Sequence, residues 1–112
     1  MKIIKLSDQN KEETPHNVDV RKMYDKKSAQ AVHITLQAGE TLKPHITSVD
    51  VFFYVLEGTP TIQIGDHKAE VYKDCLVESP KNIVHCIYNL SSSTTRILVV
   101  KAPRPTSKSK LL

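Results

Sequence analysis

Two histidines, His45 and His85, are the side chains in this sequence best placed to do chemistry together. Each lies beside an apolar block and among turn residues, in the stretches 39–58 and 74–89. Imidazole binds zinc, iron, copper, nickel and manganese alike. A tight metal site normally has three or four protein ligands, so two histidines need a further donor. If the two rings meet, the sequence predicts either one divalent transition metal or a metal-free pocket in which they hydrogen-bond to each other or to water.

Several nearby side chains are candidates for the rest of such a site. Asp50 becomes a third metal ligand if the chain is bulged by one residue as it enters the strand; otherwise it caps its own turn. His33 or Glu78 could line the pocket and supply the third ligand if either points inward, whereas an ordinary half-buried strand position is the alternative for His33. Thr47 is a poor ligand because its hydroxyl stays protonated, but it is predicted to border the pocket, with Phe53 packing along its wall.

Two other histidines and both cysteines are predicted to take no part in the site. His16 and His67 lie in turns and are expected to be solvated. Cys75 and Cys86 have no metal-binding spacing and are expected to be free thiols in a reducing compartment. Cys86 follows His85 directly, and neighbours on a strand point to opposite faces, so these two do not form a nucleophilic pair.

The elements that must position the histidines are all predicted to be strands. The block 51–56 consists of β-branched and aromatic residues without polar alternation, which is typical of a strand buried on both faces. A short strand is also predicted within residues 1–8, followed by a polar loop. Short strands at even spacing, with no convincing helix, favour a sandwich or barrel. The other predicted strands are residues 18–24, 30–36, 61–64, 69–72, 75–78, 83–88 and 95–100.

Together the two histidine stretches resemble the paired motifs of the cupin family. The first motif is Gly, five residues, His-x-His, three or four residues, Glu, six residues, Gly; the second is Gly, five residues, Pro-x-Gly, two residues, His, three residues, Asn. The resemblance covers roughly residues 30–103. The matching positions are Gly39, His45 and Gly58 in the first motif and Pro80, His85 and Asn89 in the second.

The departures from these motifs weaken the prediction of a metal site more than they weaken the prediction of the fold. Thr47 stands where the family has its second histidine, and Val51 stands where it has the glutamate, with Asp50 one position early. Asp74 and Asn82 replace the glycines of the second motif, and both types tolerate the left-handed backbone that a turn glycine supplies.

The resemblance implies an all-β, cupin-type jelly roll (double-stranded β-helix) barrel at residues 29–103. Residues 1–28 are expected to pack on the barrel or on a partner subunit, and 104–112 to be a disordered basic tail. The leading hypothesis is a barrel that binds a small organic ligand at His45 and His85, with or without a divalent metal. The alternatives are a metal-dependent dioxygenase, isomerase or decarboxylase acting on a small carbonyl or phenolic substrate, and a non-catalytic protein with a vestigial pocket.

Composition and charge exclude some classes of binding partner. With 112 residues the chain forms one domain, and its charge of +4 is concentrated toward the C-terminal tail rather than in a basic stripe. No nucleic-acid partner is therefore predicted. No apolar run approaches the length of a membrane span, and the start lacks a signal core, so a cytoplasmic protein is expected. The outward residues of strand 51–56 need a cover, which is either the N-terminal strands or a second subunit. The resemblance to cupins, in which dimers are common, favours a homodimer.

Overall fold

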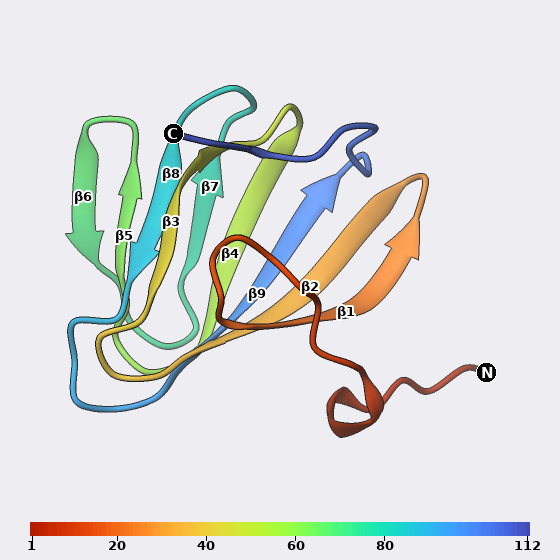
Figure 1. The fold of residues 1–112 in the computed structure, drawn as a ribbon, viewed down its shortest axis with the longest axis horizontal. Coiled ribbons are helices and arrows are strands. Elements are labelled where there is room, and N and C mark those ends of the chain that lie inside the picture. Colours follow the sequence, from red (N-terminus) through yellow and green to blue (C-terminus); the bar gives the residue numbers. More distant parts are fainter.

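The computed structural model describes all residues, 1–112, and consists of β-strands and one short 3-10 helix, η1 (Leu6–Asp8). Figure 1 shows the strands as two facing layers. No helix is long and apolar enough to cross a membrane. The strands are β1 (Asp19–Lys26), β2 (Ala29–Leu36), β3 (Thr41–Ile46), β4 (Asp50–Glu57), β5 (Thr61–Ile64), β6 (His67–Glu70), β7 (Leu76–Ser79), β8 (His85–Tyr88), β9 (Thr95–Ala102) and β10 (Lys110–Leu111).

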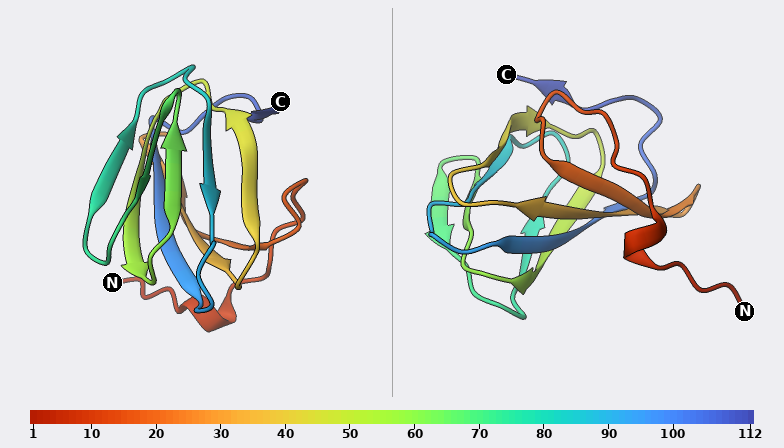
Figure 2. Two further views of the ribbon diagram at one scale, coloured as in Figure 1. Left: turned by 90° about the vertical axis from the view of Figure 1, so that its left-hand side faces the viewer. Right: turned by 60° about the horizontal axis from the view of Figure 1, so that its bottom comes forward.

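Both layers are five-stranded antiparallel sheets, and the predicted jelly-roll barrel is confirmed. One sheet has the order β1-β2-β9-β4-β7 and the other β10-β3-β8-β5-β6. Neighbouring strands come from distant parts of the chain, so β9 pairs with both β2 and β4. The two views of Figure 2 show the sheets wrapping around a common interior. The predicted strand pattern is therefore correct for most elements, and β1 pairs with β2 in the same sheet.

The core lies between the sheets and follows the two-residue period of the strands. In β4 the side chains of Val51, Phe53 and Val55 are buried, whereas Phe52 and Tyr54 on the other face are half-buried. In β2 the inward set is Val32, Ile34 and Leu36, which matches the predicted face. Burial of apolar side chains at about 25 cal/mol per Å² is the main force that holds the two sheets together.

Six residues have a left-handed backbone, and of the three glycines among them only Gly58 has no room for a side chain. Gly58 has a φ of 86°, and a Cβ there would lie 2.7 Å from the Thr94 carbonyl oxygen. Asp74 and Asn82 have φ values of 67° and 64°. They therefore adopt the conformation of the motif glycines they replace, as the sequence indicates.

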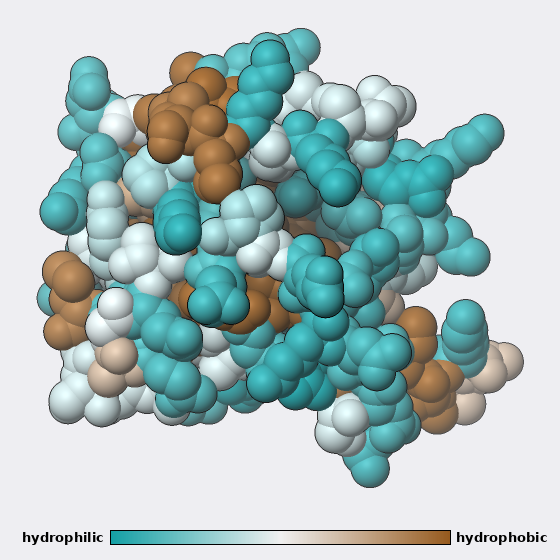
Figure 3. All heavy atoms as spheres, viewed as in Figure 1, coloured by the Kyte–Doolittle hydropathy of each residue, from teal (hydrophilic) through white to brown (hydrophobic).

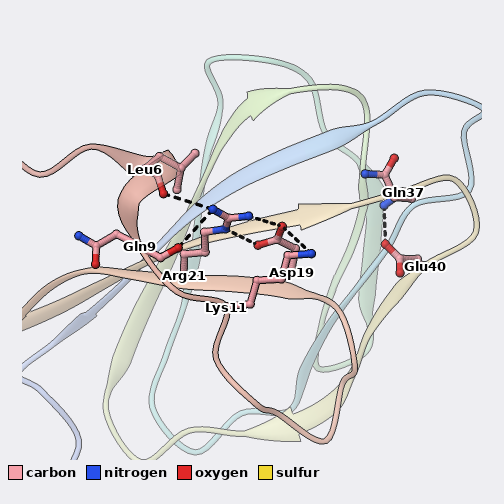
Figure 4. A network of polar contacts seen from close by, with 7 residues as sticks. All are labelled: Leu6, Gln9, Lys11, Asp19, Arg21, Gln37 and Glu40. Atoms are coloured by element: carbon pink, nitrogen blue, oxygen red, sulfur yellow. Dashed lines mark hydrogen bonds and ion pairs between the residues drawn. The ribbon is translucent and has the colours of Figure 1, made fainter.

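The N-terminal segment does not form the strand expected within residues 1–8. It contains η1 instead, and a strand side chain binds one carbonyl oxygen of η1 and that of the residue after it. Arg21 on β1 pairs with Asp19 through both carboxylate oxygens and also donates hydrogen bonds to the Leu6 and Gln9 carbonyls (Figure 4). A segment of three helical residues is too short to be stable alone, so this tether explains its position.

The C-terminal tail, for which the composition predicts disorder over residues 104–112, ends in a short strand. It crosses the open end of the barrel and ends as β10, which pairs Lys110 with Ile46 and Leu111 with His45 (Figure 1). The Ser109 hydroxyl lies 2.9 Å from the Thr47 hydroxyl. Composition misses this arrangement because strand pairing through backbone groups requires no apolar pattern.

Candidate functional site

A cavity of about 520 Å³ opens at the end of the barrel that the tail crosses. Its wall combines apolar side chains from β2, β4 and β9 with polar residues from the N-terminal loop 12–16 and the tail 105–109. In Figure 3 polar atoms dominate this face, with hydrophobic atoms visible deeper in its middle. The size and the mixed lining are typical of small-molecule sites.

His45 and His85 meet at the inner end of this cavity. They are direct partners in the register of β3 and β8, and their Nε2 atoms lie 2.9 Å apart. Their rings are nearly perpendicular, with centroids 4.3 Å apart, and the ring of Phe53 packs edge-on against His85 at 5.2 Å. Both histidines are buried, with exposed fractions of 6% and 2%. The pair is thus a fixed, largely desolvated unit.

A bulge in β3 sets the protonation of this pair. The register of β3 against β8 shifts between Leu42 and His45, which frees the backbone groups of Lys43 from the ladder. The Lys43 carbonyl oxygen lies 2.7 Å from His45 Nδ1, and a carbonyl can only accept, so Nδ1 carries the proton. In neutral His45, Nε2 is then the acceptor.

The tautomer of His45 in turn determines the tautomer of His85. His85 Nε2–H donates to His45 Nε2, so His85 Nδ1 accepts the hydroxyl hydrogen of Ser79 at 2.7 Å. Thr47 Oγ1 lies 3.3 Å from His85 Nε2. Ser79 is buried, which makes it a positioning residue rather than a nucleophile. The result is a one-way chain of hydrogen bonds from Ser79 through both histidines to the Lys43 backbone.

His16 joins the pair, contrary to the prediction that it is solvated. The Lys43 N–H donates to His16 Nδ1 at 2.8 Å, and the His16 ring centroid lies 4.8 Å from that of His45. Lys43 Nζ also donates to the Pro15 carbonyl, which holds the loop. No periodic pattern in the sequence marks His16, because its position depends on a contact with a residue 27 positions away.

Burial lowers the pKa of all three imidazoles, and neighbouring basic groups lower it further. Burial, followed by the charge of His45, lowers the pKa of His85 to about 3. The same two causes lower the pKa of His16 to about 4, and burial lowers that of His45. No carboxylate contributes to any of these shifts, so the three histidines are neutral at physiological pH.

Lys101 is the fourth basic group of the site and was missed by the sequence analysis. It lies on β9 opposite Gln30 and Val51, with its side chain on the inward face that also carries Val99. Burial lowers its pKa, and its charge lowers the pKa of His16, His45 and His85. The signal for it was present, because the inward alternation of Thr95, Ile97 and Val99 continues to position 101.

The other predicted site residues do not reach the histidine pair. Asp50 is exposed, and its carboxylate accepts a hydrogen bond from the Lys81 N–H at 2.9 Å, in a different turn from its own. Glu78 is exposed on β7. His33 is buried on the outer face of β2, where its Nε2 accepts a hydrogen bond from Arg96 Nε and its Nδ1 has no partner. Val51 points inward, so Asp50 must point outward.

These donors do not fit a resident metal ion. Two nitrogens bound to tetrahedral zinc at about 2.1 Å lie about 3.4 Å apart, whereas the two Nε2 atoms here are at hydrogen-bond distance. No group of three histidine, cysteine or acidic side chains in the chain is arranged so that it could hold a metal ion. His16 accepts from Lys43 through Nδ1, which leaves its proton on Nε2, and the nearby charge of Lys101 repels a cation.

Comparison with known sequences finds one family. The sequence pattern described as "Cupin domain" matches residues 32–101, which is more than half of the chain. No curated protein matches.

Solved structures share the fold across nearly the whole chain. TT1209 from Thermus thermophilus is 25% identical, with a TM-score of 0.80 over 94% of this chain and all of that one. The polyketide cyclase RemF from Streptomyces resistomycificus is 20% identical, with a TM-score of 0.84 over 100% of this chain and 85% of that one. KdgF from Halomonas sp. is 14% identical, with a TM-score of 0.83 over 95% and 96%.

Proposed function

Because the chain belongs to the cupin family, we propose that it binds a small organic anion, such as a carboxylate, in the mouth of its barrel, against His45, His85 and Lys101. The observation that carries the proposal is the set of basic groups at the inner end of the cavity. Three imidazoles and the Lys101 amine gather there, and no carboxylate is among the causes of any of their pKa shifts. Desolvated N–H donors and an amine without a neighbouring carboxylate favour an anionic ligand.

Binding of an anion should be coupled to the uptake of a proton. A negative charge placed beside a neutral, buried imidazole raises its pKa, so binding draws a proton from solvent. The apolar walls formed by Val51, Phe53 and Val99 exclude water and strengthen this interaction. We therefore expect affinity to rise as the pH falls from about 7 to 6.

Titration calorimetry with acetate, lactate and pyruvate tests the proposal. Binding should weaken at least about tenfold in His45→Ala and His85→Ala, and proton uptake should appear as a heat that depends on the buffer. His67→Ala is the matched control, since His67 is exposed on β6 and remote from the cavity lining. Equal affinity in all three variants, or no binding at millimolar concentration, refutes the proposal.

The rival function is a metal-dependent enzyme, and the same protein samples test it. RemF is described as a polyketide cyclase, so the fold accommodates catalysis, but the donor set here is too small for a tight site. Metal analysis of protein purified without chelator should find less than about a tenth of an equivalent. Stoichiometric metal that is lost in both histidine variants favours the enzyme instead.

The proposal also includes a second copy of the chain. Phe52, Tyr54 and Leu56 are half-buried on the outer face of β4, beside Leu98 and Val100 of β9, and such a face favours self-association. Light scattering should give twice the mass of 12.6 kDa. Phe52→Glu should yield a monomer, whereas Tyr72→Glu, at an exposed site elsewhere, should not; a monomeric wild type contradicts the dimer.

A further inference from the structure

Lys101 differs from the other basic groups of the cavity because it is a primary amine. Its Nζ makes none of the ion pairs and none of the hydrogen bonds in the structure, and burial is the only cause of its lowered pKa. By contrast Lys22, which also lines the cavity, pairs with Glu12 and Asp25. A lysine without a partner in an apolar wall costs stability, so its presence there calls for an explanation.

The surroundings of Lys101 favour a free amine. Val51 lies opposite it on β4, and Val99 precedes it on the inward face of β9. Burial beside apolar side chains reduces the free energy needed to remove a proton from an ammonium group. The deprotonated amine is a nucleophile toward carbonyl carbon.

The neighbours of Lys101 also supply groups that exchange protons. His16, His45 and His85 are close enough for its charge to lower the pKa of each. All three are neutral and keep one ring N–H, so each can donate a proton or accept one after a small rearrangement. An amine beside neutral imidazoles is the combination that carbonyl addition requires.

We propose that Lys101 captures the carbonyl group of an aldehyde or α-keto acid as a Schiff base in the barrel mouth. The inference rests on the proposed binding of a small anion and extends it, since the carboxylate of an α-keto acid would face the histidines while its carbonyl meets Nζ. The ligand class is thereby narrowed to small carbonyl compounds.

The reaction balances without an oxidant or reductant. The Nζ lone pair forms a bond to the carbonyl carbon, and the carbonyl π pair moves to oxygen, which takes up a proton. The resulting carbinolamine then loses its hydroxyl as water while a carbon–nitrogen double bond forms. Overall, the lysine ammonium group and one carbonyl group give one protonated imine and one water molecule, so every proton is accounted for.

Reductive trapping tests the inference. The full chain is incubated with pyruvate and sodium cyanoborohydride at neutral pH, and the modified lysines are quantified by intact mass and peptide mapping. Lys101 should be modified at least about ten times faster than Lys26, which is exposed in the same chain and serves as an internal control. Lys101→Arg keeps the charge but lacks the amine, so this variant should lose the fast adduct.

Lactate separates this inference from the proposed function, since it has the same charge as pyruvate and a similar size but no ketone. If both acids bind in calorimetry while Lys101 is modified no faster than Lys26, the Schiff base is overturned and anion binding stands. If neither acid binds and Lys101 is not modified preferentially, both proposals fail. A fast adduct that persists in Lys101→Arg also overturns the assignment to this residue.

Discussion

The low pKa of His85 predicts how the stability of the protein depends on pH. In the unfolded chain this histidine takes up a proton near pH 6.5, whereas in the folded chain burial and His45 keep it neutral down to about pH 3. Between these values the unfolded state binds more protons, so acid favours unfolding. The free energy of unfolding therefore decreases as the pH is lowered. The contribution is fully present above pH 6.5 and is lost as the pH approaches 3.

The size of this effect follows from linkage. One fully buried histidine of this kind contributes about 1.4 kcal/mol per pH unit, which amounts to about 2.5 kcal/mol between pH 7 and pH 4.5. His16 acts in the same direction but by less, because it is only half-buried. Domains of this size are stable by about 5–15 kcal/mol, so the loss is a large share.

Urea denaturation at pH 7.0, 6.0, 5.0 and 4.5 measures the effect, and His85→Asn removes it. Asparagine does not titrate and can still accept the hydrogen bond from Ser79, so the variant should lose about 2.5 kcal/mol less than the wild type over this range. Carboxylates contribute to acid unfolding in both proteins and cancel in the comparison. His67→Asn should follow the wild type. Parallel stability curves for wild type and His85→Asn would falsify the assignment of a neutral, buried His85.

Three further predictions concern the turns, the buried amide and the lysine. Gly58→Ala should destabilise by about 2 kcal/mol or more in urea denaturation, since its φ is 86° and its Cβ would meet Thr94; Gly39→Ala, with a similar φ and nothing within 4 Å, should cost about 1 kcal/mol, and equal costs contradict the steric argument. Asn89→Ala should cost about 2–3 kcal/mol in the same assay, because the buried amide donates to the Leu36 and Ser93 carbonyls; a loss under about 0.5 kcal/mol refutes this. Lys101→Met should raise the melting temperature, by the equivalent of about 0.5–2 kcal/mol, while abolishing binding of lactate; a lower melting temperature contradicts the view that its amine is held at a cost to stability.

The sequence predicted the barrel because a strand can be recognised from the residues within it. The alternation in β2 and the apolar block of β4 are visible without any tertiary information. Asp74 and Asn82 were interpretable as turn residues for the same reason, since a left-handed φ depends on the residue type itself. These features are properties of short segments, and the structure confirms them.

The rest of the site depends on contacts that local patterns do not encode. His16 belongs to a loop that the backbone of a distant residue holds in place, and β10 pairs through main-chain groups that carry no sequence signature. Two signals were nevertheless available. Pro44 within β3 marks a bulge, since proline in a strand is confined to edges and bulges. The inward alternation of β9 pointed to Lys101.

The bulge at Lys43 means that the main chain of one residue fixes two imidazole tautomers. Its N–H donates to His16 and its C=O accepts from His45. The side chain has a separate part, because its Nζ donates to the Pro15 carbonyl and holds the loop that carries His16. Replacement of Lys43 by alanine therefore removes the contact with the loop but keeps the two main-chain groups, which every residue type except proline supplies.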